Sequence, residues 1–452
     1  MQSINPTNGK LIKEYKEYSN KEVINIIDAV EADWQIWKKT SFSHRKNLMQ
    51  NAAQVLLDKK QEFAETMSLE MGKPLTESLA EVEKSAWVCN YYADEAENIL
   101  ADEYIESDAS KSFVSFEPIG IVLAVMPWNF PFWQVFRFAA PALMAGNAAV
   151  LKHASNVQGS ANDIERVFKL AGFPKNLFRN LIIKSNQVEA VIENPKIKAS
   201  TLTGSEFAGS RVAMASGRKI KKTVLELGGA DAFIILKDAD IEKAAKVAVQ
   251  ARMLNNGQSC IAAKRFIIDK SVLSSFISLI NSELDLLKIG NPLENGIQIG
   301  PLARADLREE IHSQVEQTIE QGATLLRGGK FIEEDGYFYE PTIISNLKPG
   351  MKLYYEESFG PVFSIFSFDT EEEAIQIAND SDFGLGGSLW TKDLAKGESL
   401  ARKIESGGIF INGMTKSDPR LPFGGIKKSG YGRELSHYGI KEFVNMKTIW
   451  IG

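Results

Sequence analysis

Cys260 and Glu226 have the residue types and the surroundings that covalent catalysis requires. Cys260, one of only two cysteines in the chain, follows the small and polar run 255–259. That setting leaves a thiol open to a small molecule, and the thiolate is the reactive nucleophile. Glu226 ends an apolar run and precedes Gly228-Gly229, so we expect it at the end of a buried strand. Burial raises the pKa of a carboxyl group toward the range of a general base.

Neither residue establishes a function alone, because a lone cysteine is more often inert than catalytic, and a glutamate beside two glycines usually lies in a solvated turn. Four motifs strengthen the case. They are PWNFP at 127–131, LELGG at 225–229, GQSC at 257–260 and EESFGP at 356–361. In this order and at these distances, the motifs resemble those of the NAD(P)-dependent aldehyde dehydrogenase superfamily. The resemblance covers essentially the whole chain.

The resemblance implies a covalent intermediate on Cys260. Its thiolate would attack the aldehyde carbon to give a thiohemiacetal, whose oxyanion the Asn129 side chain and the Cys260 backbone N–H would hold. Hydride transfer to a nicotinamide would leave a thioester, and Glu226 would activate the water that hydrolyses it. A free thiol with a pKa of about 8.5 is only a few per cent ionised at pH 7. We therefore expect activation of Cys260 by Glu226, water or the charge of the cofactor.

The resemblance also implies a nicotinamide cofactor. Gly204 and Ser205 follow a predicted strand and begin a helix, the context in which a pyrophosphate binds a helix N-terminus. Their spacing is not the G-x-G-x-x-G fingerprint, and the match is to the looser Thr-Gly-Ser version of the family. Glu357 and Phe359 match the family's nicotinamide-ribose contact and nicotinamide-packing residue, and Trp128 is a further cofactor-binding candidate.

Lys152 and Ser155 bear on the choice between NADP and NAD. In the resembling family the lysine bonds the adenine-side ribose, and NAD-preferring members often carry glutamate three positions later. Ser155 stands there in this chain, so the repulsion of a 2′-phosphate is absent, while Lys152 supplies a cation. We predict NADP as the preferred cofactor and NAD as the other candidate. The alternative is that Ser155 only caps a helix.

Arg137 and Ser417 are the candidate substrate-binding residues. Arg137 stands in an apolar stretch, where an unpaired guanidinium is costly unless it meets an anion such as a substrate carboxylate. The alternative is that Arg137 pairs with an internal acid. Both positions match those of succinate-semialdehyde dehydrogenases, most closely the short bacterial type. Oxidation of succinate semialdehyde to succinate is therefore the predicted reaction; a general aliphatic or aromatic aldehyde, glutarate semialdehyde, and a catalytically silent relative are the alternatives.

Short apolar runs that alternate with helices surround these residues and predict an α/β fold with parallel sheets. We expect two amphipathic helices within 21–70 and a third at 75–101. The helices predicted in the second half lie at about 241–254, 271–286 and 305–321. The predicted strands lie at 120–126, 148–152, 181–183, 199–203, 232–236, 265–268 and 360–365.

These elements predict two doubly wound parallel-sheet domains and a small β oligomerisation domain. The cofactor-binding domain would comprise 1–101 and 120–228, and the catalytic domain 229–435. Residues 102–119 and 436–452 look strand-like, and in the resembling family such segments form a projecting oligomerisation sheet. An exposed strand edge needs a partner, so we expect a homodimer or homotetramer.

Composition excludes several other classes. A net charge of −6 argues against a nucleic-acid partner, which would normally require a basic face. Two cysteines and four scattered histidines give no metal-ligand spacing, so we predict no metal site. The N-terminal residues lack the apolar stretch of a signal peptide, and no run of about 18 apolar residues occurs. We therefore expect a cytoplasmic protein that contacts no membrane.

Overall fold

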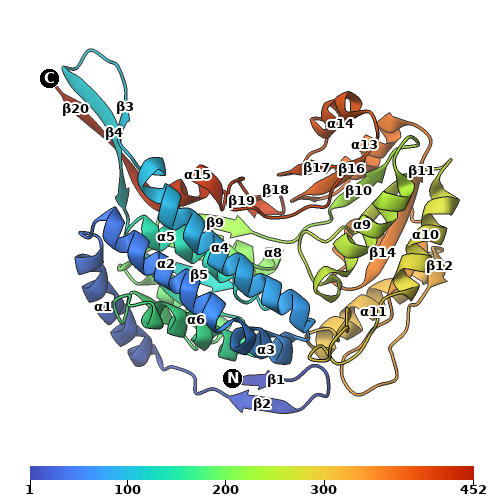
Figure 1. Ribbon diagram of the computed structural model, residues 1–452, viewed down its shortest axis with the longest axis horizontal. Coiled ribbons are helices and arrows are strands. Elements are labelled where there is room, and N and C mark those ends of the chain that lie inside the picture. The colour runs from blue at the N-terminus through green and yellow to red at the C-terminus, as the bar shows by residue number, and fades with distance from the viewer.

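The computed structural model describes residues 1–452, and a six-stranded sheet forms the centre of their first half (Figure 1). Its strands are parallel except for β19, which runs antiparallel to β9. Helices cover both faces, so the central strands are apolar nearly throughout. Across the sheet the strands are β19 (Gly430–Tyr431), β9 (Lys222–Glu226), β8 (Ile197–Thr203), β5 (Ile121–Met126), β6 (Ala148–His153) and β7 (Phe178–Asn180).

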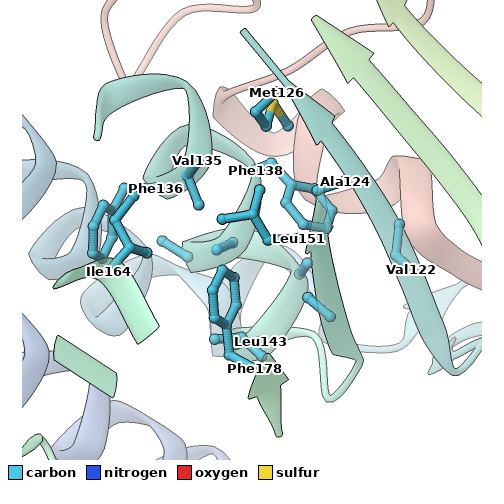
Figure 2. Close-up of a cluster of buried hydrophobic side chains, with 14 of the residues drawn as sticks. Val122, Ala124, Met126, Val135, Phe136, Phe138, Leu143, Leu151, Ile164 and Phe178 are labelled. Carbon is cyan, nitrogen blue, oxygen red and sulfur yellow. The ribbon is translucent and has the colours of Figure 1, made fainter. Parts of the chain in front are cut away.

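The core of this half is built around α5 (Trp133–Met144), all of whose residues are buried. Figure 2 shows Phe136 and Phe138 of this helix packed among side chains of the sheet and of α6. Full burial of one such side chain contributes about 1.5–3 kcal/mol, so this packing fixes α5 firmly. The other helices are α1 (Asn20–Trp37), α2 (Phe42–Asp58), α3 (Lys60–Met71), α4 (Leu75–Ile99), α6 (Gln158–Leu170), α7 (Val188–Glu193) and α8 (Glu206–Arg218).

Two local predictions are wrong. The segment 21–70 forms three helices instead of two, because the backbone at Lys59 (φ −109°, ψ 16°) interrupts the second. The apolar run 181–183 is not a strand; the strand is β7, just before it. Leu181 and Ile183 are nevertheless fully buried, so their apolar character reflects packing and not sheet pairing.

The second half is organised by a seven-stranded sheet in which only β12 is antiparallel to its neighbour. Helices pack on both of its faces, as predicted for a doubly wound fold. These helices are α9 (Ile241–Met253), α10 (Leu273–Asp285), α11 (Ala305–Glu320), α12 (Lys352–Tyr355), α13 (Glu371–Asn379) and α14 (Leu394–Ala401). The strands are β12 (Thr324–Arg327), β13 (Thr342–Ser345), β14 (Val362–Phe368), β11 (Arg265–Asp269), β10 (Ala232–Ile235), β16 (Gly387–Trp390) and β17 (Ile409–Ile411).

A narrow antiparallel arm of three strands projects from the body (Figure 1). It consists of β20 (Val444–Ile451), β4 (Lys111–Pro118) and β3 (Glu103–Tyr104). The domain bounds stay a prediction. Residues 430–431 (β19), which that prediction assigns to the catalytic domain, pair with β9 of the first sheet. A short hairpin, β1 (Gln2–Ile4) and β2 (Leu11–Glu14), precedes α1. No helix has both the length and the apolar character that crossing a bilayer requires.

Candidate active site

Cys260 follows α9 and the short turn η3 (Leu254–Gly257), and it lines a cavity to which residues of both halves contribute. Within this turn Asn255 and Asn256 adopt left-handed backbone angles, with φ of 56° and 57°. Such angles are unfavourable for non-glycine residues and persist only where neighbours hold them. The Asn255 N–H donates to the Glu77 carboxylate at 2.8 Å, and the Asn256 side chain donates to the Gly72 carbonyl at 2.9 Å. These contacts fix the loop that presents the thiol.

Two cavities meet at Cys260. The large cavity has a volume of about 680 Å³ and brings together seven of the predicted site residues: Trp128, Asn129, Gly204, Ser205, Cys260, Glu357 and Phe359. The small cavity, about 190 Å³, has Cys260 in its wall together with Arg137 and Ser417. Cys260 therefore lies in the wall of a cavity on each of two sides, as a reaction between two bound molecules requires.

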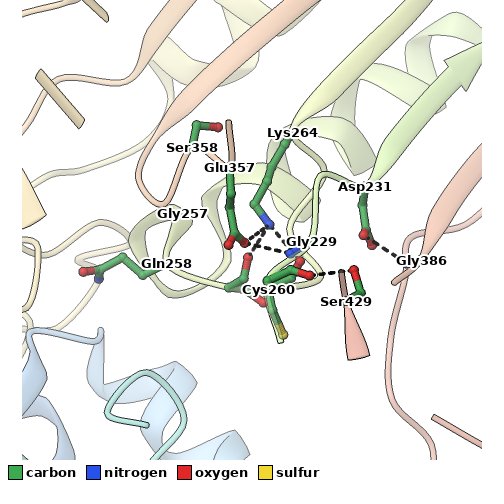
Figure 3. A network of polar contacts seen from close by, with 12 residues as sticks. Gly229, Asp231, Gly257, Gln258, Cys260, Lys264, Glu357, Ser358, Gly386 and Ser429 are labelled. Carbon is green, nitrogen blue, oxygen red and sulfur yellow. Dashed lines mark hydrogen bonds and ion pairs between the residues drawn. The ribbon is translucent and has the colours of Figure 1, made fainter. Parts of the chain in front are cut away.

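Burial raises the pKa of the Cys260 thiol to about 12, and the nearby cations Lys264 and Arg137 oppose that rise. Lys264 is itself buried, and its ammonium donates to the carbonyls of Ser259 (2.9 Å) and Cys260 (2.7 Å). It also forms an ion pair with Glu357 at 3.0 Å (Figure 3). Lys264 thus joins the thiol loop to the loop of Glu357.

Replacing Lys264 with methionine is expected to slow alkylation of Cys260 by iodoacetamide about tenfold at pH 9. Removal of the cation raises the thiol pKa further, and one unit of pKa changes the thiolate fraction tenfold. The rate constant of alkylation, followed by mass spectrometry of the Cys260 peptide, measures this change directly. Lys264→Arg keeps the charge and should stay near the wild-type rate. An equal or faster rate in Lys264→Met would contradict the electrostatic role.

Asn129 is buried beside Cys260 and held from two directions. Its side-chain Nδ2 donates to the Gln258 backbone carbonyl at 3.0 Å, and its backbone carbonyl accepts from Asn255 Nδ2 at 2.7 Å. The side-chain amide has two N–H groups; one hydrogen bond is formed, and Asn129 lines the large cavity together with Cys260. This arrangement suits an oxyanion donor.

Glu226 ends β9, as predicted, and is almost completely buried. Both carboxylate oxygens lack a hydrogen-bond partner. Burial raises its pKa well above the usual value, and the neighbouring Glu434 carboxylate raises it further. Glu226 is not among the residues that line either cavity at Cys260. Its Oε1 instead lies at Gly424, where an added Cβ would sit only 2.7 Å away.

Arg137 meets an internal acid, which is the alternative that the sequence left open. Its guanidinium forms a buried ion pair with Glu434, and Nη2 donates to the Thr203 hydroxyl at 3.3 Å. The same group lies over the ring of Phe423, 4.6 Å from its centroid. Arg137 also lines the small cavity, but its charge is already compensated.

Lys84 is a candidate residue that the sequence analysis missed. It lies on α4, in the wall of the small cavity, and its ammonium donates to the Ser417 hydroxyl at 2.9 Å. The available signal was its spacing: Glu77, Glu81 and Lys84 recur at positions i, i+4 and i+7, which share one helix face. That face is turned toward Cys260 and not toward solvent.

A third cavity of about 590 Å³, the side cavity, continues from the large one and shares Pro127, Thr203, Gly204 and Phe207 with it. Lys152 lines the side cavity, has no carboxylate partner, and has its pKa lowered by burial. Ser155 is exposed and does not line the side cavity. Its neighbour Ala154 does line that cavity.

The joined cavities suit a dinucleotide. Their junction lies at the N-terminus of α8, which the Ser205 hydroxyl caps by accepting from the Ala208 N–H at 3.3 Å. A helix N-terminus with an unpaired lysine nearby is favourable for phosphate groups. In the large cavity, Trp128 and Phe359 meet edge to face with centroids 5.8 Å apart, and each offers apolar ring surface against which an aromatic ring can pack. The residues present therefore fit a nicotinamide dinucleotide.

Comparison with known proteins gives consistent results. Residues 1–449 match the model of the aldehyde dehydrogenase family. A Synechocystis protein named probable succinate-semialdehyde dehydrogenase (NADP+) is 50% identical over 99% of both chains. A Mycobacterium avium protein named succinate-semialdehyde dehydrogenase (NADP+) is 46% identical over 100% of this chain and 96% of its own.

Solved structures agree with the fold described above. The crystal structure of succinic semialdehyde dehydrogenase from Streptococcus pyogenes, determined in complex with NADP+, superimposes with a TM-score of 0.98. The two sequences are 38% identical, and the alignment covers 100% of this chain and 99% of that one. The likeness therefore extends over both large sheets and the arm.

Proposed function

The chain belongs to the aldehyde dehydrogenase family, and from that premise we propose that it oxidises succinate semialdehyde to succinate with NADP+. The observation that carries the proposal is the small cavity, in which cationic side chains and the Cys260 thiol line one volume of about 190 Å³. An aldehyde with a carboxylate at its far end matches that combination. The names of the relatives at 46% and 50% identity support the same substrate and cofactor.

The proposed chemistry takes place on Cys260. Its sulfur forms a bond to the aldehyde carbon, and the carbonyl oxygen becomes an oxyanion that Asn129 Nδ2 and the Cys260 N–H hold. The nicotinamide, when bound, supplies the acceptor for the hydride that leaves this carbon. Because burial raises the pKa of the free thiol to about 12, we propose that the positive charge of the oxidised cofactor favours the thiolate.

Hydrolysis of the resulting thioester is assigned to Glu226. Its carboxylate would take a proton from water while the water oxygen attacks the thioester carbon, and the Cys260 thiolate would leave with the released electron pair. Since Glu226 does not line the cavities at Cys260, we propose that its side chain turns from Gly424 toward the thioester for this step. Its raised pKa makes the ionised base scarcer as the pH falls.

NADP is proposed over NAD because Lys152 offers an uncompensated cation in the side cavity, and because no glutamate stands at position 155. Arg137 and Ser417 are proposed to line the substrate site, with Arg137 oriented by Glu434. The exposed apolar side chains of the arm, among them Tyr104, Met446 and Trp450, support a homodimer or homotetramer in which a second copy covers them. A cytoplasmic location stays a prediction.

The decisive experiment compares kcat/KM for succinate semialdehyde and for butanal, each with NADP+ and with NAD+. We expect at least about a hundredfold preference for the acid aldehyde, because a site built for a polar group discriminates strongly against analogues that lack it. NADP+ should be preferred over NAD+. Equal activity on butanal would contradict the substrate assignment, and a preference for NAD+ would contradict the role of Lys152 and position 155. A preference for glutarate semialdehyde would mean that the natural substrate is one methylene longer than succinate semialdehyde.

A further inference from the structure

Two lysines without a carboxylate partner line the small cavity: Lys416, which is exposed, and Lys84, which is half-buried. Lys84 Nζ donates to the neutral hydroxyl of Ser417 at 2.9 Å and lies 4.2 Å from the ring centroid of Trp133. It forms no ion pair with any Asp or Glu, although the side chain is half-buried. Partial burial of an unpaired charge is unfavourable unless an anion compensates it.

The charged groups around Lys84 are already engaged elsewhere. Glu81, one turn away on α4, pairs with Lys73 and accepts the backbone N–H groups of Phe132 and Trp133. On the loop that carries Ser417, Asp418 pairs with Arg420 at 2.7 Å. The remaining neighbours that face this ammonium are cations, Lys416 on the same loop and Arg137 on α5. Glu77, the other carboxylate in the wall of the small cavity, accepts the Asn255 N–H at 2.8 Å and forms no ion pair with Lys84. Each carboxylate near Lys84 is therefore engaged by another group.

We propose that Lys84 is the residue that binds the far carboxylate of the substrate, with the Ser417 hydroxyl as its second donor. The proposal rests on the proposed function, since it requires an aldehyde that carries a carboxylate. It also changes the part assigned to Arg137: the Arg137 guanidinium is neutralised by Glu434, whereas the ammonium of Lys84 is free to take a new anion.

The contacts in the structure describe how the carboxylate would be held. A substrate oxygen would accept one N–H of Lys84, and the Ser417 hydroxyl, which now accepts from Lys84, would turn its own hydrogen toward the other oxygen. Trp133 would keep the ammonium in place through its ring face. The aldehyde end would then point toward Cys260, which lines the same cavity.

Burial and the neighbouring cation Arg137 lower the pKa of Lys84 to about 8. The charged form therefore predominates below pH 8 and is lost above it. In the wild-type enzyme the KM for succinate semialdehyde should rise as the pH passes from 8 to 10, while the KM for butanal should not follow. Lys84→Arg carries a guanidinium that stays protonated throughout this range, so its KM for succinate semialdehyde should lack the alkaline rise.

The test compares Lys84→Met with Lys416→Met, which removes an exposed cation from the rim of the same cavity. The quantity measured is kcat/KM for succinate semialdehyde divided by kcat/KM for butanal. We expect this ratio to fall about 30-fold in Lys84→Met, in the range for loss of a charge-assisted hydrogen bond, and less than about threefold in Lys416→Met. Thermal unfolding verifies that each variant is folded. If Lys84→Met does not fold, Lys84→Gln takes its place in the comparison.

Two results would overturn the assignment of Lys84. One applies if the wild-type enzyme prefers the acid aldehyde: the ratio of the two kcat/KM values in Lys84→Met then stays within threefold of the wild-type ratio. The other is an equal fall of this ratio in Lys416→Met. That result would mean that the positive charge around the cavity attracts the acid aldehyde without a direct contact to Lys84. A wild-type enzyme with no preference for the acid aldehyde would overturn the proposed substrate, and the role of Lys84 with it. Failure of the Lys84 assignment can therefore be distinguished from failure of the proposed substrate.

Discussion

Replacement of Cys260 by alanine is expected to lower kcat by at least about 10⁴-fold, because removal of a nucleophile that forms the covalent intermediate leaves no equivalent route. Cys260 is the only cysteine that lines either cavity, and the other cysteine, Cys89, is completely buried in the core. No second thiol can take its place. NADPH formation at 340 nm, measured with saturating succinate semialdehyde, gives the loss in kcat.

Cofactor binding should survive this change. Cys260 contributes one of many side chains to the large cavity, and Trp128 in that cavity offers a fluorescence signal that a bound dinucleotide would quench. The Kd for NADP+ in Cys260→Ala should therefore lie within about threefold of the wild-type value. Cys89→Ala is the matched control, since it removes the other thiol; it is expected to lose some stability but to keep kcat. Turnover retained in Cys260→Ala would exclude Cys260 as the nucleophile.

The sequence predicts most of the fold because its apolar runs are long enough to identify buried strands. The run at 120–126 becomes β5 and that at 232–236 becomes β10, and both lie inside parallel sheets as expected. The break at Lys59 could not be predicted, because no glycine or proline marks the end of α2 and good helix formers such as Leu57 and Lys60 lie on both sides of it. The run at 181–183 was misassigned because three apolar residues do not distinguish a strand from a buried loop.

The site is predicted where a motif fixes it and is missed where tertiary contacts decide it. The residues of PWNFP, GQSC and EESFGP meet in the large cavity because each motif follows an element that ends at the junction of the two sheets. The pairing of Arg137 with Glu434 joins distant parts of the chain and has no local signature. Lys84 is a charged residue on an amphipathic helix, where a solvated position is the usual expectation.

Replacement of Glu226 by glutamine is expected to separate the two halves of the reaction. Glutamine keeps the size of the side chain but cannot take a proton from water, so thioester formation continues while hydrolysis slows. General-base catalysis contributes about 10²–10⁴-fold, and the steady-state rate should fall by that factor. A rapid burst of NADPH, equal to one per Cys260, should precede the slow phase in stopped-flow absorbance.

Rescue by an external nucleophile distinguishes this interpretation from general damage to the site. Hydroxylamine attacks a thioester without the help of a base, so it should raise the steady-state rate of Glu226→Gln while having little effect on the wild-type enzyme. The pH dependence should change as well: in the wild type, hydrolysis slows as the pH falls through the raised pKa of Glu226, and Glu226→Gln should lose that dependence. A variant without a burst and with an unchanged steady-state rate would show that another group activates the water. The buried, unpartnered carboxylate at the end of β9 would then need a structural explanation.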